Sequence, residues 1–292
     1  MSDPDDKTVS LVLGSGGARG LAHIGVIQVL EEKGYEISSI AGCSIGALIG
    51  GIYAAGKLDE YEKWVRELSR LDIVNMMDIA WEGGGLVKGD RIVGEMIKLV
   101  GERQIEDLPI RFTAVATELE TGMEVWLSKG PLFDAIRSSI SLPLFFTPVK
   151  HRRNLLIDGG VVNPVPIAPT FDDQTDLTIA VNLGGKPVKE ESTGRDLVPV
   201  AEPTQSPGKI KQLVNRVRNR VSRKVRGGDI GAYDVAYQAF DAMQSTIARQ
   251  KLAAYPPDLV IEIPRNACRT LEFDRAAEMI DLGRKVALAT LP

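Results

Sequence analysis

Apolar residues recur along this chain either in short continuous runs or at the spacing of one helix face. The short runs predict strands at Val9–Leu13, before Ser44, and at Phe112–Ala116, Glu124–Leu127, Asn154–Ile157, Leu177–Leu183 and Leu259–Ile263. The helical spacing predicts helices at Leu21–Gly34, after Gly46, near Asp59–Arg70, and at Asp90–Val100, Ala232–Ala254 and Asp274–Leu288. This alternation predicts an α/β fold, a three-layer α/β/α sandwich with a mostly parallel central sheet and a helical C-terminal extension.

One long segment interrupts this alternation. Residues 186–208 are rich in Pro, Glu, Ser and Thr and have little periodicity, which is typical of an exposed linker. We therefore expect a disordered N-terminus at residues 1–8 and a main domain at residues 9–185. After the linker, residues 209–292 are expected to form a basic helix and an α/β segment that packs on the main domain.

Composition narrows the class of protein. The chain of 292 residues is 44% hydrophobic and 25% charged, with a net charge of −4, which is typical of a soluble protein and gives no case for nucleic acid. Cys43 and Cys268 have no partners at metal or disulfide-framework spacing, which favours a reducing compartment. The acidic N-terminus lacks the layout of a signal peptide. We expect a cytoplasmic protein without metal or cofactor.

The uncharged stretch Ile37–Gly56 is about as long as a bilayer span. Its five glycines and central Gly42-Cys43-Ser44-Ile45-Gly46 instead favour a strand, a sharp turn and a buried helix. Gly-x-Ser-x-Gly between a strand and a helix is the pattern of a nucleophile elbow, in which Gly42 and Gly46 leave room for an exposed Ser44 hydroxyl. The alternative is a simple tight turn with Ser44 as a helix N-cap.

A serine nucleophile requires a base. In the usual order of Ser, acid and His, only His151 of the two histidines, His23 and His151, follows Ser44. No acidic residue between Ser44 and His151 is framed like a catalytic turn, so a Ser-His-Asp triad is disfavoured. Asp158 ends an apolar strand and precedes Gly159 and Gly160, which permit a sharp turn. Catalytic groups gather at the carboxyl edge of open α/β sheets, so Asp158 is the candidate base, with a pKa raised by partial burial. A plain turn is the alternative.

A glycine-rich loop follows the first strand. The N–H groups of Gly16 and Gly17, next to a helix N-terminus, suit the developing negative charge of a transition state. The competing interpretation is a dinucleotide fingerprint, but Arg19 and Ser15 occupy glycine positions of that pattern, depending on the register. A P-loop is excluded because the loop has no Gly-Lys-Ser/Thr.

These motifs, in this order, resemble the patatin-like phospholipase family. The three marks are Gly16-Gly17-Ala18-Arg19-Gly20, Gly42-Cys43-Ser44-Ile45-Gly46 and Asp158-Gly159-Gly160, the last being Asp-Gly-Gly or Asp-Gly-Ala in the family. Further stretches are similar to bacterial members related to the neuropathy target esterase catalytic domain: Val115–Gly122, Ala135–Ser139 leading to Pro143, and Asn163–Pro166. The resemblance covers roughly residues 9–185.

The resemblance implies a Ser44–Asp158 dyad without histidine. It also implies an oxyanion hole from the backbone of Gly16 and Gly17, supported by Ala18-Arg19-Gly20, with Arg19 setting the loop and attracting a phosphate. The implied reaction is hydrolysis of acyl lipid esters through an acyl-enzyme, without a metal. Ser15 departs from the family, in which many members have glycine at this position.

The segment Lys209–Arg226 carries eight Lys or Arg residues, no acid and one narrow apolar stripe. This composition is typical of an interfacial helix, and we expect peripheral binding to an anionic membrane. A surface helix packed on the core and a nucleic-acid arm are the alternatives, the latter disfavoured because no aromatic residues are interleaved.

Besides a lipid hydrolase, two functions remain open: a non-catalytic lipid-binding scaffold and a nucleotide-binding enzyme. Oligomeric state is not indicated.

Overall fold

The computed structural model describes residues 7–77, 87–188 and 232–292. The predicted basic helix Lys209–Arg226 lies outside the described residues, as do residues 1–6 and all but the first three residues of the predicted linker. The chain divides into two compact units, residues 1–188 with 241–292, and residues 189–240. The larger unit contains every strand described below.

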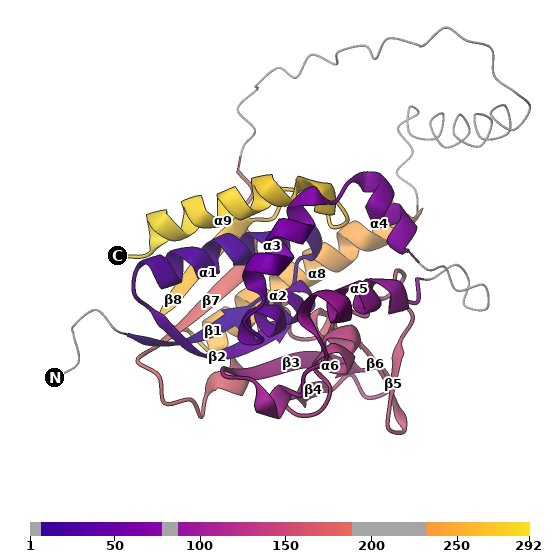
Figure 1. The fold of residues 1–292 in the computed structure, drawn as a ribbon, viewed down its shortest axis with the longest axis horizontal. Coiled ribbons are helices and arrows are strands. Elements are labelled where there is room, and N and C mark those ends of the chain that lie inside the picture. Colours follow the sequence, from indigo (N-terminus) through magenta and orange to yellow (C-terminus); the bar gives the residue numbers. More distant parts are fainter. Residues whose placement is uncertain (1–6, 78–86, 189–231) are drawn as a thin grey trace, which may run out of the picture. The chain divides into compact units, whose positions relative to one another are not determined.

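A central sheet organises the larger unit (Figure 1). Its described strands are β1 Thr8–Leu13, β2 Glu36–Cys43, β3 Arg111–Glu118, β4 Glu124–Leu127, β5 Val149–His151, β6 Asn154–Asp158, β7 Leu177–Gly185 and β8 Leu259–Pro264. The order is β5-β6-β3-β2-β1-β7-β8, with β4 paired to β3. From β3 to β8 all neighbours are parallel, whereas β4, β5 and β6 pair in antiparallel fashion. The predicted mostly parallel sheet is confirmed.

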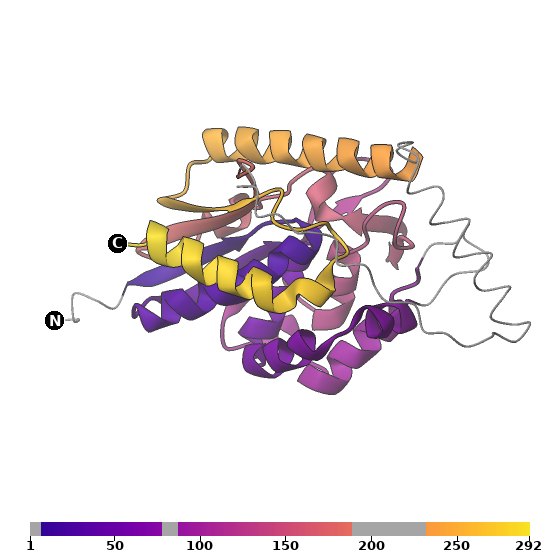
Figure 2. The ribbon, with the colours of Figure 1, turned by 90° about the horizontal axis from the view of Figure 1, so that it is seen from above.

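Helices cover both faces of this sheet (Figure 2). The described helices are α1 Ala22–Glu32, α2 Ile45–Ala54, α3 Leu58–Glu67, α4 Arg70–Met76, α5 Asp90–Val100, α6 Leu132–Ser139, α8 Ala232–Ala254 and α9 Ala276–Thr290. The alternation of strand residues explains the two faces. On β1, Leu11 and Leu13 join the main core with α1, α2 and α9, and Val12 packs in a second cluster with Ala248 of α8. The three-layer sandwich and its C-terminal helix are confirmed.

The uncharged stretch Ile37–Gly56 forms β2, a turn and α2, as predicted. Nearly every residue of α2 is buried, so its uniformly apolar sequence reflects burial within the sandwich. Among the described helices, none combines the length and apolar character needed to cross a membrane.

The expected helix near Asp59–Arg70 corresponds to α3, and a second helix, α4, which was not predicted, follows it. α3 ends at Glu67, and Ser69 then caps α4 by accepting a hydrogen bond from the N–H of Asp72. The Asp72 carboxylate reciprocally accepts from the N–H of Ser69, which completes a capping box. The sequence analysis also did not predict α6 or the short strand β5.

Candidate active site

The predicted elbow is present between β2 and α2. Ser44 has φ of 56° and ψ of −125°, a conformation that residues with a side chain rarely adopt. A Cβ on Gly42 would lie 2.5 Å from the Gly46 carbonyl oxygen, and one on Gly46 would lie 2.1 Å from that of Leu13. Both contacts are with backbone, so glycine is required at each position and the strained turn is held rigidly.

The sheet register brings Asp158 to this turn. β3 pairs with Cys43 at Val115 and with Asp158 at the next residue, Ala116. The Ser44 Oγ donates a hydrogen bond to the Asp158 Oδ2 over 2.5 Å. A distance this short is typical of a hydroxyl bound to a carboxylate.

The route by which Asp158 reaches the sheet edge differs from the expected one. We expected the carboxyl end of its strand to lie at the carboxyl edge because strands of such sheets run in parallel. β6 instead runs antiparallel to β3 and pairs only with the last residues of β3, Ala116–Glu118. Asp158 therefore lies just beyond the carboxyl end of β2 even though β6 enters from the opposite direction.

Burial sets the acidity of Asp158. The carboxylate is fully buried, and this desolvation raises its pKa to about 6. Hydrogen bonds from Ser44, from the Gly160 N–H (2.7 Å to Oδ1) and from the Cys43 thiol (3.9 Å to Oδ1) act in the opposite direction and moderate the rise. Burial also raises the pKa of the Cys43 thiol, which therefore stays protonated as a donor. The result is a carboxylate with unusually high basicity.

Ser139, at the end of α6, holds the elbow from the side. Its Oγ accepts a hydrogen bond from the Ser44 N–H (2.9 Å) and donates one to the Val115 carbonyl (2.6 Å). The hydroxyl thus fastens the strained residue to the strand that pairs with Asp158. The sequence analysis assigned no role to Ser139, because nothing in its local pattern distinguishes it from Ser138.

The glycine-rich loop has two N–H groups to offer. Three neighbouring N–H groups are already engaged by backbone carbonyls: the N–H of Gly14 donates to the carbonyl of Val181, that of Ser15 to the carbonyl of Pro164, and that of Ala18 to the carbonyl of Thr270. Within the described part of the chain, the intervening N–H groups of Gly16 and Gly17 donate to no acceptor. Such free donors at the start of a helical segment suit an anionic group.

This loop also contacts the elbow. A Cβ on Gly20 would lie 2.2 Å from the Ile45 side chain, and Gly17, with φ of +59°, faces Thr270 at 2.3 Å in the same way. Gly17 and Ser44 line the same cavity. The structure therefore places the loop against the residue that follows Ser44.

Arg19 is buried and anchors this loop to the C-terminal segment. Its guanidinium forms an ion pair with Asp241 of α8 (2.5 Å) and donates to the Arg265 carbonyl (2.5 Å). These contacts fit the expected role in setting the loop, whereas burial keeps the guanidinium away from a phosphate in solvent. Ser15 accepts a hydrogen bond from the Gln244 side chain (3.2 Å), so it too ties the loop to α8.

Neither histidine takes part in this arrangement. His23 is fully buried on α1, and its Nε2 bonds to the Gly14 carbonyl (2.9 Å), so that nitrogen carries the proton. Burial lowers the pKa of His23 to about 4. His151 lies on β5, in the hairpin with β6. In the described residues, Asp158 is the hydrogen-bond partner of the Ser44 hydroxyl.

An apolar cavity of about 130 Å³ opens beside Ser44. Side chains from four helices, α2 to α5, the segment after α6 and the segment before α9 line it: Ile45, Leu48, Tyr61, Trp64, Val65, Leu68, Ile73, Met76, Ile92, Met96, Leu142, Phe145, Phe146, Leu271 and Phe273. These residues were not predicted from the sequence, because apolar residues on helices and in connecting segments equally indicate ordinary core packing. Within the described ranges, no group of three or more His, Cys, Asp or Glu side chains is placed to hold a metal ion.

The chain was compared with known proteins. The patatin-like phospholipase family matches residues 11–171. An uncharacterized NTE family protein of Mycobacterium tuberculosis is 38% identical over 97% of this chain and 91% of its own length. Lysophospholipase NTE1 of Saccharomyces cerevisiae is 30% identical over 61% of this chain and 11% of that much longer protein.

Among solved structures, VipD from Legionella pneumophila aligns with a TM-score of 0.42 and 14% identity, over 99% of this chain and 68% of that chain. The sequence matches are the stronger findings, since one spans more than half of the chain and another nearly all of it. The chain therefore belongs to the patatin-like phospholipase family and is a lipid ester hydrolase.

Proposed function

We propose that this protein cleaves the acyl ester bond of lipids in two steps, with Ser44 as nucleophile and Asp158 as general base. The observation that carries the proposal is the 2.5 Å hydrogen bond between the two side chains, with Ser44 lining an apolar cavity. A nucleophile needs a base at hydrogen-bond distance, and Asp158 meets that condition directly.

In the first step, Asp158 takes the Ser44 proton as Oγ attacks the ester carbonyl carbon. The N–H groups of Gly16 and Gly17 stabilise the oxyanion that forms, a contribution of about 10²–10³ in rate for each donor in comparable enzymes. Asp158 then returns the proton to the departing alkoxide, which leaves the acyl group on Ser44. In the second step, water attacks this acyl-enzyme, its proton passes to Asp158, and the fatty acid departs as Ser44 regains its proton.

The raised pKa of Asp158 supports this assignment. A base works best when its pKa lies near the working pH, and burial brings this carboxylate to about 6. That value is close to the ordinary pKa of histidine, which serves this role in many serine hydrolases. The dyad therefore requires no third residue.

The apolar cavity supports an acyl chain as the group held beside Ser44. The relatives from Saccharomyces cerevisiae and Kluyveromyces lactis are named lysophospholipases, so a lysophospholipid is the first physiological substrate to test. The substrate class proposed here is a single-chain or two-chain acyl glycerolipid.

Ser44→Ala is the test of this function. The wild-type protein is expected to hydrolyse p-nitrophenyl butyrate and lysophosphatidylcholine, and Ser44→Ala to lose about 10⁴-fold or more in kcat because the nucleophile is gone. Ser138→Ala is the matched control, since that hydroxyl bonds within its own helix to the Asp134 carbonyl. Full activity in Ser44→Ala would overturn the assignment, and binding of lipid without hydrolysis by the wild type would favour the scaffold alternative.

Membrane association is a separate part of the proposal. We retain the division into a catalytic domain at residues 9–185, a linker at 186–208 and a C-terminal part at 209–292, in which Lys209–Arg226 docks peripherally on anionic lipid. Sedimentation with vesicles that contain phosphatidylserine is expected to pellet the protein more than vesicles of phosphatidylcholine alone. Equal sedimentation of a variant with these eight basic residues changed to glutamine would contradict this part.

A further inference from the structure

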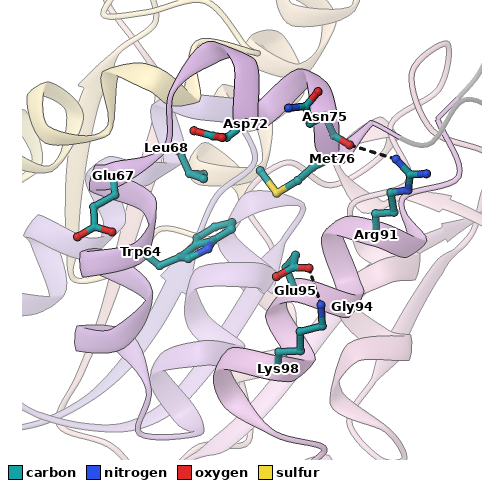
Figure 3. A pocket seen from close by; sticks show the side chains of 10 residues that line it. All are labelled: Trp64, Glu67, Leu68, Asp72, Asn75, Met76, Arg91, Gly94, Glu95 and Lys98. Atoms are coloured by element: carbon teal, nitrogen blue, oxygen red, sulfur yellow. Dashed lines mark hydrogen bonds and ion pairs between the residues drawn. The ribbon is translucent and has the colours of Figure 1, made fainter.

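A second hollow lies behind the apolar cavity. It is a groove of about 580 Å³ formed by α3, α4 and α5, and Figure 3 shows the side chains that line it. In this view the indole of Trp64 and the thioether of Met76 point into the middle of the groove, with Leu68 beside them. Charged residues lie around this apolar centre, on the same three helices.

The two hollows share one wall. Trp64, Leu68 and Met76 line both the groove and the cavity that contains Ser44, so these three side chains separate them. All three are only partly buried, and α4, which supplies Met76, has no buried residue at all. The wall is therefore made of partly exposed side chains, unlike the buried glycines of the elbow, although Trp64 and Leu68 also pack on the main core.

Four of the five charged residues that line the groove, all except Glu67, form hydrogen bonds or ion pairs around its apolar centre. Lys98 pairs with Glu95 (2.7 Å), and Arg91 donates to the Asn75 carbonyl (3.2 Å). The Asp72 carboxylate belongs to the capping box of α4. An apolar group that entered the groove would thus meet Trp64, Leu68 and Met76 first, and these are the residues that face the Ser44 cavity from the other side.

We propose that Trp64, Leu68 and Met76 form a wall that sets the acyl chain length this protein accepts. A short chain attached at Ser44 ends against the wall, whereas a longer chain must displace it and continue into the groove. This inference rests on the proposed function, since it takes the cavity as the acyl site. It adds to that function the residues that determine specificity, and it states that they favour short acyl chains over long ones.

Leu68→Ala and Met76→Ala test the wall. Each removes part of it, so kcat/KM for p-nitrophenyl palmitate relative to the butyrate is expected to rise about tenfold or more, as methylenes gain an apolar site. Leu68→Phe thickens the wall and is expected to lower the same ratio. Lys63→Ala, at an exposed position of α3 that lines neither hollow, is the matched control and should leave the ratio unchanged.

The outcomes separate the two proposals. If the wild type hydrolyses no ester, the proposed function fails. If the wild type is active but the palmitate-to-butyrate ratio is the same in Leu68→Ala, Met76→Ala and Leu68→Phe, the wall is overturned and the dyad stands. The opposite responses of the Ala and Phe variants at one position exclude a general loss of stability as their cause.

Discussion

The two sides of the active site are built in different ways. On one side, Ser44 and Asp158 are positioned by backbone: the elbow closes against Leu13, and the turn after Asp158 closes against Val115. On the other side, the apolar cavity is bounded by side chains of α2 to α5 and of the segments after α6 and before α9, several of them partly exposed.

This difference assigns the two sides different tasks. On the first side, backbone segments pack so closely that only glycine fits between them, and this holds the reacting atoms within narrow limits. Such precision is required because a short carboxylate acts directly on the serine. Side chains that line the cavity can be replaced by others of similar volume at little cost in stability, so this side can determine which acyl chain is accepted. We therefore expect substitutions on the first side to remove activity or stability, and substitutions on the second to change substrate preference.

Asp158→Asn is expected to have the largest effect on this contrast. An amide of the same shape cannot accept the Ser44 proton, so kcat should fall by about 10³–10⁴-fold. Steady-state hydrolysis of p-nitrophenyl butyrate measures the loss. Asp281→Asn, on a carboxylate whose side chain is 72% exposed and faces Arg66, offers a matched control.

The same substitution is expected to increase stability at pH 8. Folded Asp158 ionises only above a pKa of about 6, whereas the unfolded chain ionises near the ordinary value of 3.8, so the wild type loses stability as pH rises from about 4 to 6. Asparagine carries no charge and removes this loss, so the free energy of unfolding at pH 8 should rise by about 3 kcal/mol at most, the value that corresponds to the shift in pKa. Urea unfolding at pH 8 and pH 4 measures it. A gain that does not shrink at pH 4 would be inconsistent with burial of a charge.

The two glycines after Asp158 are expected to differ. A Cβ on Gly159 would lie 2.2 Å from the Val115 carbonyl oxygen, which is fixed in the sheet, so Gly159→Ala should cost about 3 kcal/mol or prevent folding. A Cβ on Gly160 would meet side-chain atoms of Gln244 and Ser15, which can move, so Gly160→Ala should cost about 1 kcal/mol. Thermal unfolding compares them. Equal losses would contradict the backbone account.

The pH profile gives the smallest effect. Because Asp158 must be ionised to act as base, kcat/KM of the wild type should rise with a midpoint near pH 6 and fall about tenfold per unit below it. An unperturbed aspartate would put the midpoint near 4. His23 does not account for a midpoint near pH 6, since its pKa is about 4 and its Nε2–H donates a hydrogen bond to the Gly14 carbonyl. A flat profile from pH 5 to 8 would contradict the assignment.

The same contrast explains what could be predicted from the sequence. The strands other than β5, the elbow and the Asp158 turn were predicted because each requires glycine or continuous apolar residues at fixed places. The Asp-Gly-Gly or Asp-Gly-Ala variation of the family agrees with the structure, in which Gly159 meets backbone and Gly160 meets side chains. The meeting of Ser44 and Asp158 depends on strand register, and here the sequence led to the right edge for the wrong reason, because β6 is antiparallel.

The side-chain half of the site could not be predicted in this way. Ser139 resembles its neighbour in sequence, and its role depends on where α6 ends relative to the elbow. Trp64, Leu68 and Met76 look like ordinary apolar helix positions until α3 and α4 are placed beside α5. The burial of Arg19 depends on Asp241, more than two hundred residues away in the chain.

Labelling with a fluorophosphonate tests the dyad most directly, because the reagent traps an activated serine without depending on the substrate chosen. We expect a single adduct on the peptide that contains Ser44 in the wild type, none in Ser44→Ala, and slow labelling in Asp158→Asn, all measured by intact mass and peptide mapping. An adduct on another residue, or equal labelling rates in the wild type and Asp158→Asn, would contradict the Ser44–Asp158 dyad.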